Sequence, residues 1–339
     1  MARSEITIDL SALRHNVGVL GAALGGSELW AVVKANAYGH GALECAQTAL
    51  GAGATALCVA TVPEALALRP ALPGARIVVL GPTVERHDLA ASRSAGLELV
   101  VSGEIPEGVK VHVKLDTGMG RWGVSELGTL PSRVVGVMTH LATADTDLEF
   151  AREQVARFLA ATEAVSHLTR HAANSAAALR LPEARLDAAR CGIALYGLSP
   201  FGTDPAADGL RPVLSWTSEV GLCRLLRPGE STGYGRRFVA ERDTWIAIVP
   251  VGYADGFRRD MTGTEVLVAG ELRGVVGVVS MDAFAVELDR EVPRGTPVTI
   301  VGPGAPLERH ARVADTITYE LAARIESGPG RATRVVVDS

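Results

Sequence analysis

The chain has 339 residues, of which 21% are charged and 47% are hydrophobic, and its formal net charge is −5. This length favours two domains, and the composition excludes a disordered chain and a nucleic-acid protein built on bulk positive charge. Only three of the 33 lysine and arginine residues are lysines, at positions 34, 110 and 114. Genomic base composition can explain the excess of arginine, but it does not explain where the three lysines stand.

The amino terminus and the four cysteines indicate a cytoplasmic protein. The first ten residues show no apolar core or cleavage pattern of a signal peptide, and no apolar run reaches the roughly 18 residues of a transmembrane helix. The cysteines are far apart and form no CxxC pair, which is typical of buried thiols in a reducing compartment. We therefore expect a protein that holds no metal ion and binds neither membranes nor nucleic acid.

From residue 30 to about residue 197, short apolar runs alternate with segments rich in alanine and leucine. Eight runs are candidates for strands buried on both faces: Trp30–Ala35, Ala56–Ala60, Ile77–Gly81, Leu97–Ser102, Val111–Asp116, Val134–Ala142, Leu168–Ala173 and Ala188–Gly197. Helices are expected at Ser11–Leu24, Gly41–Gly51, Val62–Arg69, His87–Ala95 and Asp147–Val165. This alternation predicts a (β/α)8 barrel of the TIM type, with a doubly wound sheet as the alternative.

One connection of the predicted barrel is too short for an outer helix. Only Gly103–Lys110 lies between the fourth and fifth strands, and it contains Pro106 and Gly108 as well as Gly103. Either the barrel lacks this helix or the number of strands is wrong by one. Lys110 lies in this turn and is expected to face water.

After about Leu210 the pattern changes to strands separated by Gly, Pro and Asp turns. The strand candidates are Val213–Leu226, Trp245–Val251, Glu265–Leu288, Pro297–Gly302 and Arg334–Asp338, and the one expected helix is His310–Ile325. We therefore predict a barrel domain at residues 1–210, a mostly β domain at residues 211–339, and a hinge region at Pro200–Pro212.

Lys34 closes an apolar strand in the segment WAVVKANAYGH, residues 30–40. Burial disfavours the charged form of a lysine and lowers its pKa toward that of a free amine. At the carboxyl end of a barrel strand, such a lysine is suited to forming a Schiff base. A lysine that merely reaches solvent at the end of the strand is the alternative.

A second segment, VHVKLDTGMGRWG at residues 111–123, combines three ionisable residues with a glycine-rich turn. Strand alternation places Lys114 and Asp116 on one face, and the turn brings Arg121 above the same strand end. This arrangement predicts a charge network, or alternatively a salt-bridged rim of the barrel.

These two segments resemble the pyridoxal-phosphate pocket and the substrate clamp of the alanine racemases, which are fold-type III enzymes. Seven residues of the second segment match the family pattern: Lys114, Asp116, Thr117, Gly118, Met119, Arg121 and Gly123. Further segments resemble the family in the same order, at residues 139–145, 171–177, 190–197, 233–236, 252–256, 280–282 and 318–320. The resemblance extends from about residue 5 to about residue 335.

The resemblance implies a homodimer with shared active sites that interconverts L-alanine and D-alanine for the cell wall. Lys34 would bind pyridoxal 5′-phosphate covalently and, once the substrate has displaced it, would act as a base on one face of Cα. Tyr234 of the partner subunit would be the base on the opposite face. A phenol is a weak acid, and Arg121 and a network through His140 would help it to ionise.

The same resemblance implies a set of residues that hold the cofactor. Arg190 would face the pyridine nitrogen, which would stay unprotonated because a guanidinium does not readily give up a proton. The phosphate would be held by Ser175, Gly192, Ile193 and Tyr319, with Tyr38 nearby. His140 and Asn174 would complete the cofactor-binding set.

Other residues are assigned by the resemblance to the substrate and its surroundings. Arg121 and the backbone N–H of Met281 would bind the substrate carboxylate. Tyr253 and Asp255 would lie toward the partner-facing entrance, and Asp282 would have a structural role. In much of the family the lysine that matches Lys114 is carbamylated by CO2, which would turn a cation beside Arg121 into an anion; an unmodified lysine is the alternative.

The chain departs from the family in two places and leaves other functions to consider. It is shorter than usual at Gly103–Lys110, and Gly274 and Gly277 stand where bulkier or charged residues are common. A racemase of serine or of broader specificity is an open alternative, because few residues define the substrate pocket. A fold-type III decarboxylase or a non-catalytic pyridoxal-phosphate carrier is less favoured, because Arg190, Tyr234 and the second domain do not fit them.

Overall fold

The structure is a computed structural model that describes residues 3–81, 86–325, 328 and 330–338. The chain divides into two compact units, one formed by Ala12–Phe201 and Pro205–Arg211, the other by Met1–Ser11, Gly202–Asp204 and Pro212–Ser339. The barrel unit therefore begins at Ala12 rather than at residue 1. The physical reason is that the first strand pairs with strands of the second unit.

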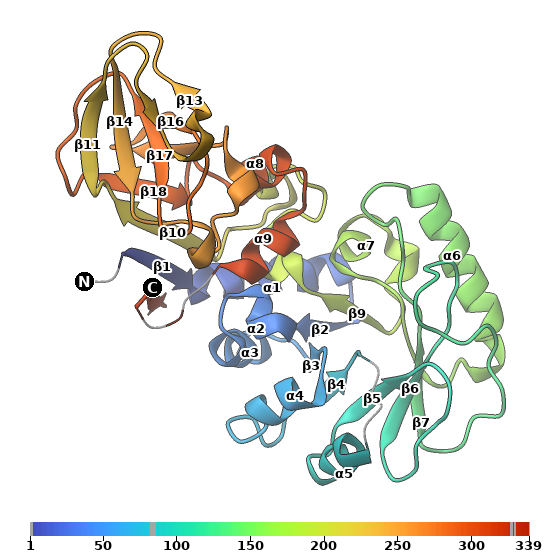
Figure 1. Cartoon of the computed structure of the whole chain (residues 1–339). Helices are drawn as coiled ribbons and strands as arrows, with labels where there is room; N and C mark the ends of the chain where they lie inside the picture. Colours follow the sequence, from blue (N-terminus) through green and yellow to red (C-terminus); the bar gives the residue numbers. More distant parts are fainter. Residues whose placement is uncertain (1–2, 82–85, 326–327, 329, 339) are drawn as a thin grey trace. The chain divides into compact units, whose positions relative to one another are not determined.

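The first unit contains a closed barrel of eight parallel strands (Figure 1). In chain order they are β2 (Glu28–Val32), β3 (Ala56–Val59), β4 (Ile77–Val79), β5 (Glu98–Val101), β6 (Lys110–Lys114), β7 (Val134–Met138), β8 (Thr169–His171) and β9 (Ala188–Cys191). The last strand pairs with the first and closes the barrel. Each strand overlaps one of the eight apolar runs, so the predicted barrel is confirmed.

Helices follow most of the barrel strands. They are α1 (Leu10–Leu24) before the barrel, then α2 (Lys34–Tyr38), α3 (Ala42–Gly51), α4 (Val62–Leu68), α5 (Arg86–Ser94), α6 (Leu148–Ala161) and α7 (Ser175–Arg180). No helix lies between β5 and β6 or between β6 and β7, where residues 102–109 and 115–133 are all described. The number of strands is therefore right, and two outer helices are missing rather than one.

Two arginines hold the short connection between β5 and β6 in place of a helix. The Nε of Arg93 donates to the carbonyl of Glu107 at 2.8 Å, and the Nη2 of Arg133 donates to the carbonyl of Ile105 at 3.0 Å. Gly108 has a φ of +70°, and a Cβ there would lie 2.9 Å from the Nε of Arg93. The glycine thus allows the loop to pack closely against the arginine.

The second unit is built on a nine-stranded sheet in the order β11-β14-β17-β16-β15-β18-β10-β1-β19. Its strands are β1 (Ser4–Asp9), β10 (Leu214–Glu219), β11 (Leu222–Leu226), β14 (Thr244–Val249), β15 (Glu265–Val268), β16 (Glu271–Val276), β17 (Phe284–Leu288), β18 (Pro297–Val301) and β19 (Ala332–Val337). A small hairpin, β12 (Ser231–Thr232) and β13 (Phe238–Val239), joins β11 to β14. The predicted mostly β domain is confirmed.

The single helix expected at His310–Ile325 is wrong, because the structure has two helices, α8 (Leu307–Val313) and α9 (Thr318–Arg324). Asp315 between them has a left-handed φ of +47°, and the N–H of Thr316 donates to the carbonyl of Ala311 at 2.9 Å. Aspartate tolerates this conformation better than most residues, and the chain then becomes extended at Ile317. The apolar pattern continues across this break, which is why it suggests one helix.

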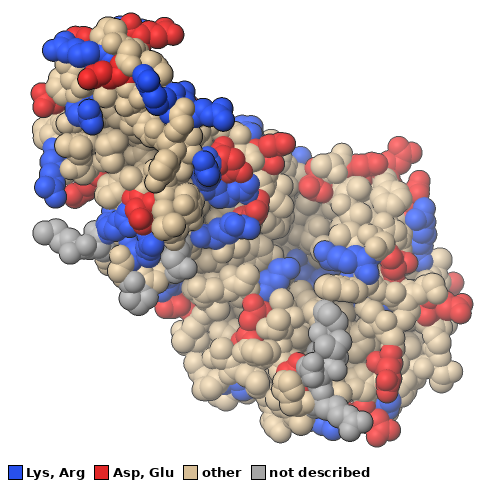
Figure 2. Space-filling model, viewed as in Figure 1, with Lys and Arg blue, Asp and Glu red and all other residues tan. Residues whose placement is uncertain are grey.

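All four cysteines are free thiols; Cys45, Cys58 and Cys191 are buried and Cys223 is half-buried. Within the described residues, none of the helices combines the length and the apolar character that spanning a bilayer requires. On the face of the second unit shown in Figure 2, basic and acidic side chains are interspersed.

Candidate functional site

Most of the predicted barrel residues lie at the carboxyl ends of strands, where barrels of this type carry their active sites. Lys34 follows β2, Lys114 ends β6, and Arg190 lies in β9. Because β2 pairs with β9, Trp30 of β2 is in register with Arg190. Because the strands are parallel, these three cationic side chains lie toward the same open end of the barrel, where the carboxyl ends of the strands meet.

Lys34 begins a turn with an unusual backbone. The four residues Ala35, Asn36, Ala37 and Tyr38 all have φ between +50° and +55°, which is a left-handed helical turn made without glycine. Each such residue costs about 1–2 kcal/mol, so tertiary contacts must hold the turn in place. Strain of this kind directly after Lys34 is typical of a functional site.

Glu64 is the main tether of this turn. Its Oε1 accepts from the backbone N–H of Ala35 at 2.8 Å, while its Oε2 accepts from those of Ala60 at 2.7 Å and Thr61 at 3.1 Å. Thr61 and Glu64 also form the capping box of α4. One carboxylate thus joins the turn after β2 to the helix that follows β3.

Lys34 is half-buried, and burial, followed by the charge of Arg121, lowers its pKa from the usual value for a lysine. Glu64 works in the opposite direction but does not outweigh these effects. At a given pH, a larger fraction of this amine is therefore neutral than for an exposed lysine. A neutral amine is the form that acts as a nucleophile or as a base.

Arg190 is almost completely buried and makes several hydrogen bonds at once. Its Nη1 donates to Nδ1 of His171 at 2.8 Å and to the carbonyl of the same residue at 2.9 Å. Its Nη2 lies within hydrogen-bond distance of the carbonyls of Thr139 and Ala172 and of Nδ1 of His140. Burial lowers the pKa of Arg190 to about 10, so the guanidinium stays charged at neutral pH.

His140 is a neutral imidazole with a defined tautomer. Burial, together with Arg190, Lys114 and other nearby cations, lowers the pKa of His140 to about 3. Its Nδ1 faces Nη2 of Arg190 at 3.3 Å, and an arginine can only donate. The ring proton of His140 is therefore on Nε2, which makes that atom a hydrogen-bond donor.

The segments after β8 and β9 bring a hydroxyl and several backbone N–H groups together. The backbone N–H groups of Gly192 and Ala194 donate to the Oγ of Ser175 at 3.0 Å and 3.4 Å. Asn174 caps α7 by accepting from the backbone N–H of Ala177 at 3.0 Å, which fixes the neighbouring Ser175. A Cβ at Gly192 would lie 2.6 Å from the hydroxyl of Tyr38, so only glycine fits beside that ring.

This donor set fits the phosphate and ring of pyridoxal 5′-phosphate. Hydroxyl and backbone N–H donors that converge on one point suit a phosphate, and a charged arginine suits an unprotonated ring nitrogen. Ile193, which follows Gly192 at the start of a 3-10 turn (Ile193–Tyr196), adds a further backbone N–H to this segment. The predicted cofactor residues of the barrel therefore have the chemistry that the cofactor requires.

Lys114 and Arg121 lie near each other, with Trp122 beside both. The Nζ of Lys114 is 5.9 Å from the ring centroid of Trp122, and the guanidinium carbon of Arg121 is 5.5 Å from it. Burial and then the charge of Arg121 lower the pKa of Lys114 to about 8. Burial and the charge of Arg121 thus increase the neutral fraction of Lys114 at a given pH.

Asp116 has a different role from the one expected in a charge network. Its carboxylate accepts from the backbone N–H groups of Gly118, Met119 and Gly120 at 2.8–3.1 Å, and these bonds hold its pKa below the usual range. The carboxylate therefore shapes the glycine-rich turn. Gly123 closes the turn, because a Cβ there would lie 2.4 Å from the backbone N of Asp116.

The other predicted site residues belong to the second unit. Two of its loops, Gly252–Asp255 and Ser280–Asp282, touch closely, since a Cβ at Gly252 would lie 2.3 Å from the carbonyl O of Ser280. The backbone N–H of Ala254 also donates to the carbonyl of Met281 at 3.0 Å. Tyr253 and Met281 are thereby brought together, and both side chains are exposed.

Two carboxylates stabilise these loops. Buried Asp255 accepts from the backbone N–H of Gly252 at 2.8 Å and from Arg331 at 3.4 Å. Asp282 pairs with Arg3 at 3.1 Å and with Arg331 at 2.7 Å, and these hydrogen bonds lower its pKa. Asp282 thus ties the loop to the residues that directly precede β1 and β19.

Tyr234 lies in a short turn (Tyr234–Arg236) between β12 and β13, and 67% of it is exposed. Strand β12, which leads into the turn, packs against Gly277, whose φ is +68° and whose Cβ would lie 3.1 Å from the carbonyl O of Thr232. The positive φ and the close backbone of Thr232 thus explain why glycine stands at position 277, whereas a side chain at position 274 would have open space. Tyr319 is half-buried in α9 of the same unit.

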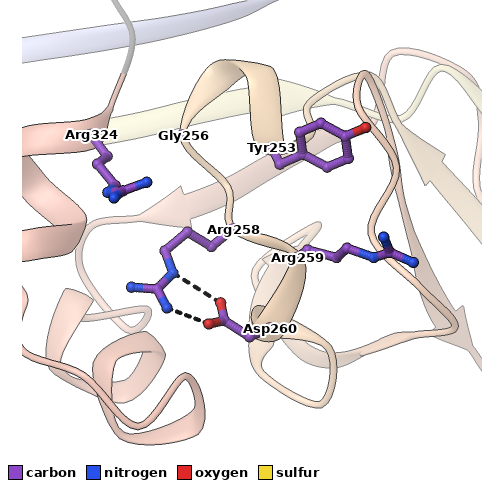
Figure 3. Close-up of a pocket in the computed structure, with 6 residues that line it drawn as sticks. All are labelled: Tyr253, Gly256, Arg258, Arg259, Asp260 and Arg324. Carbon is purple, nitrogen blue, oxygen red and sulfur yellow. Dashed lines mark hydrogen bonds and ion pairs between the residues drawn. The ribbon is translucent and has the colours of Figure 1, made fainter.

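A cavity of about 610 Å³ opens on the second unit beside Tyr253 (Figure 3). Its lining residues are Tyr253, Gly256, Arg258, Arg259, Asp260 and Arg324. Figure 3 shows Arg258 paired with Asp260, while Tyr253 and Arg259 lie on the other side of the chain. Arg258 and Arg324 also pair with Glu320, so two carboxylates offset much of the positive charge of this cavity.

The barrel also contains polar residues that the sequence pattern does not single out. His112, His171 and Glu98 are buried inside the barrel, and Glu64 holds the strained turn. A signal for His112 is its position two residues before Lys114, since alternate residues of a strand share a face. His171 begins one of the family segments, but its contact with Arg190 depends on the pairing of distant strands.

Comparisons with known proteins agree over both units. Family models described as alanine racemase N-terminal domain and C-terminal domain match residues 8–200 and 213–335. The chain is 39% identical over 353 residues to alanine racemase 1 of Bacillus subtilis (strain 168), covering 94% of this chain and 90% of that protein. It is 38% identical over 374 residues to an alanine racemase of Mycolicibacterium smegmatis, covering 98% and 95%. The solved structure of the biosynthetic alanine racemase from Pseudomonas aeruginosa has a TM-score of 0.92 at 35% identity, covering 99% of this chain and 100% of that chain.

Proposed function

Because this chain belongs to the alanine racemase family, we propose that it interconverts L-alanine and D-alanine with pyridoxal 5′-phosphate as cofactor. The observation that carries the proposal is the carboxyl-end opening of the barrel, where Lys34 with its lowered pKa, the buried Arg190 and the hydrogen-bonded Ser175 and Gly192 occur together. This combination supplies an amine nucleophile, a fixed cation and a phosphate cradle.

In this proposal the barrel holds the cofactor through donors at several points. Ser175 and the backbone N–H groups of Gly192 and Ile193 bind the phosphate, beside the hydroxyl of Tyr38, and Arg190 faces the pyridine nitrogen. His140, Asn174 and, from the second unit, Tyr319 complete the set. When bound, the cofactor draws electrons from Cα of the amino acid and makes its proton acidic. Arg190 keeps the ring nitrogen unprotonated, which moderates that effect and disfavours side reactions.

Two bases act on opposite faces of the substrate Cα. The Nζ of Lys34 removes or returns the proton on one face, and the lowered pKa of Lys34 favours the neutral amine that this requires. The hydroxyl of Tyr234 of the partner subunit does the same on the other face. His140 carries its proton on Nε2 and so can donate to the phenolate, which together with Arg121 favours ionisation.

The substrate carboxylate is bound by Arg121 and by the backbone N–H of Met281. Lys114 orients Arg121 after carbamylation by CO2, which reacts with the neutral amine. The lowered pKa of Lys114, about 8, supports this assignment because it enlarges the neutral fraction. Carbamylation also replaces repulsion between two cations by attraction.

The active form is a homodimer with shared sites in the cytoplasm, and it supplies D-alanine for the cell wall. The exposure of Tyr253 and Met281 on adjoining loops of the second unit supports this part of the proposal, because large apolar side chains are seldom exposed together without a partner. Tyr234 is exposed as well. Tyr253 and Asp255 then lie toward the entrance of the site.

The test is a chiral assay in deuterium oxide with added cofactor. The wild-type enzyme should invert both enantiomers of alanine and exchange their Cα–H for deuterium. After removal of free cofactor it should also show the visible absorption band of cofactor bound to a lysine amine. Lys34→Ala should lose the band and the exchange, whereas Lys110→Ala, at an exposed lysine, should keep both. Retention of band and exchange by Lys34→Ala would show that Lys34 has another role. Faster turnover of serine than of alanine would favour the broader-specificity alternative.

A further inference from the structure

A continuous row of buried polar side chains runs through the interior of the barrel away from Arg190. Nη1 of Arg190 lies 2.8 Å from Nδ1 of His171, and Nε2 of His171 lies 3.0 Å from Nδ1 of His112. Nε2 of His112 then lies 2.9 Å from Oε2 of Glu98, which also accepts from Nε of Arg76 at 2.9 Å. Both histidines are fully buried and Glu98 is 7% exposed.

Only one placement of protons satisfies every bond in this row. Arg190 can only donate, so Nδ1 of His171 must accept and the ring proton of His171 must be on Nε2. That proton is donated to Nδ1 of His112, whose own proton must therefore also be on Nε2. The last proton is donated to the carboxylate of Glu98. A second proton on either imidazole would place two donors against each other.

The electrostatics of the barrel agree with this placement. Burial lowers the pKa of His112 and lowers that of His171 well below its ordinary value, so both rings are neutral. Burial alone would raise the pKa of Glu98, but its hydrogen bonds with His112 and Arg76 keep that pKa below its ordinary value. The row therefore has a cation at one end, an anion at the other and two neutral rings between.

Gly136 leaves the space that the row of polar side chains occupies, although a glycine weakens its strand. A Cβ at Gly136, in β7, would lie 2.2 Å from Nδ1 of His112, so only glycine fits there. A glycine inside a strand weakens it and commonly marks a close approach of this kind. Trp30 covers both rings, with centroid distances of 4.5 Å to His171 and 5.6 Å to His112.

We propose that His171, His112 and Glu98 position the guanidinium of Arg190 through a hydrogen-bond chain of fixed direction, with Glu98 as its anionic end. The proposal rests on the proposed function, in which Arg190 faces the cofactor. Each ring turns its unprotonated Nδ1 toward Arg190, so the chain presents an oriented dipole to the guanidinium in a medium of low dielectric constant. The three residues are positioning residues, because they act through Arg190.

The direction of the chain can be tested without any substrate. Nitrogen-15 spectra of the full-length enzyme labelled at histidine should show His171 and His112 as neutral rings protonated at Nε2. A ring proton on Nδ1 of His171, or a doubly protonated ring at neutral pH, would overturn the proposal. An enzyme that shows the expected tautomers but does not racemise alanine would refute the proposed function alone.

The positioning role is tested by two variants that break the chain. His112→Phe and Glu98→Leu should lower kcat by about tenfold or more. They should shift the absorption band of the bound cofactor, because Arg190 loses its orientation. The KM for alanine should change by less than about twofold, since Arg121 and Met281 are untouched. A lower melting temperature with kcat and band unchanged would overturn the proposal.

Two milder variants provide the conservative replacement and the matched control. Glu98→Gln keeps an acceptor for His112 and should retain most of kcat, but the loss of charge should shift the nitrogen signals of His171. Glu28→Gln removes a carboxylate that also faces Arg76, at 3.5 Å, and that accepts from Trp30, yet it should leave the signals of His171 in place. If Glu98→Leu or His112→Phe does not fold, Glu98→Gln and Glu28→Gln provide the test. Nitrogen signals of His171 at the same positions in these two variants would overturn the proposal.

Discussion

Lys114 illustrates how burial and charge act on a single residue. It ends β6 with 5% of its surface exposed, and its positive neighbour Arg121 adds repulsion to the cost of burial. As a cation, this lysine therefore costs stability in the folded protein. The cost disappears when the lysine is neutral or when its charge changes sign.

A pH dependence follows for the unmodified protein. The pKa of Lys114 is about 8 in the folded state against 10.5 as the usual value, so between these limits the unfolded chain binds more protons and stability rises with pH. Lys114→Met should be more stable than wild type by about 1–2 kcal/mol at pH 7, which is less than the full pKa difference would give because relaxation and nearby water screen part of the effect. The difference should vanish above about pH 10.5.

Urea unfolding in buffer free of CO2, at pH 7 and at pH 10.5, measures this difference. Lys110→Met is the matched control, because Lys110 is exposed and should show no such change between the two pH values. An equal effect of the two substitutions at both pH values would contradict the assignment of the pH dependence to Lys114.

At the level of residues, the sequence locates groups that stand at strand ends but not the contacts between them. Lys34 and Lys114 can be predicted because a charge that closes an apolar run is unusual. The role of Asp116 could not be predicted, since its oxygens bind backbone groups that only the folded turn brings together. The chain from Arg190 to Glu98 joins four different strands, so no local pattern contains it.

Among the elements, the left-handed turn α2 is the most strained. Its four residues lack the glycines that such a conformation favours, and Glu64 holds its first backbone N–H. Because Lys34 begins this turn, the strain fixes the direction in which the lysine leaves the strand.

Replacing Ala35 by glycine should relieve the strain of a positive φ at this position, whereas glycine in an ordinary helix lowers stability. Ala35 is exposed and has a φ of +50°, so Ala35→Gly should be neutral or stabilise the protein by up to about 1 kcal/mol. Ala22→Gly, at an exposed position in the right-handed helix α1, should instead destabilise it by about 0.5–1 kcal/mol. Denaturant unfolding of both variants gives the comparison. Equal losses in the two would show that the turn is not strained.

The elements themselves could largely be predicted, because strands buried on both faces are continuous apolar runs. The predictions fail where a single residue changes the backbone, as at Asp315 between α8 and α9. The missing helix between β6 and β7 also follows from glycines, here at positions 118, 120 and 123, whose positive φ values serve the turn rather than a helix. Strand β1 is not among the predicted strands, because its partners β10 and β19 are both distant in the sequence.

For the whole molecule, the proposed sharing of active sites has a quantitative consequence. In an equal mixture of Lys34→Ala and Tyr234→Phe chains, half of the dimers would be mixed, and each mixed dimer would have one complete site and one site lacking both bases. Unfolding and refolding the mixture together should therefore restore about one quarter of wild-type activity.

Each variant refolded alone is the control and should stay close to inactive. Mixtures that recover nothing, although mass analysis shows mixed dimers, would place Tyr234 in the site of its own chain.

The pairing of β1 with β19 also has a consequence for the order of synthesis. Ser4 is in register with Ala332, so two neighbours in the sheet are made more than three hundred residues apart. The ribosome releases β1 first and the whole barrel next, and β1 keeps open hydrogen-bonding edges until β10 and β19 emerge. The barrel can therefore fold while the chain is still growing, but the second unit can complete this sheet only after β19 has been made.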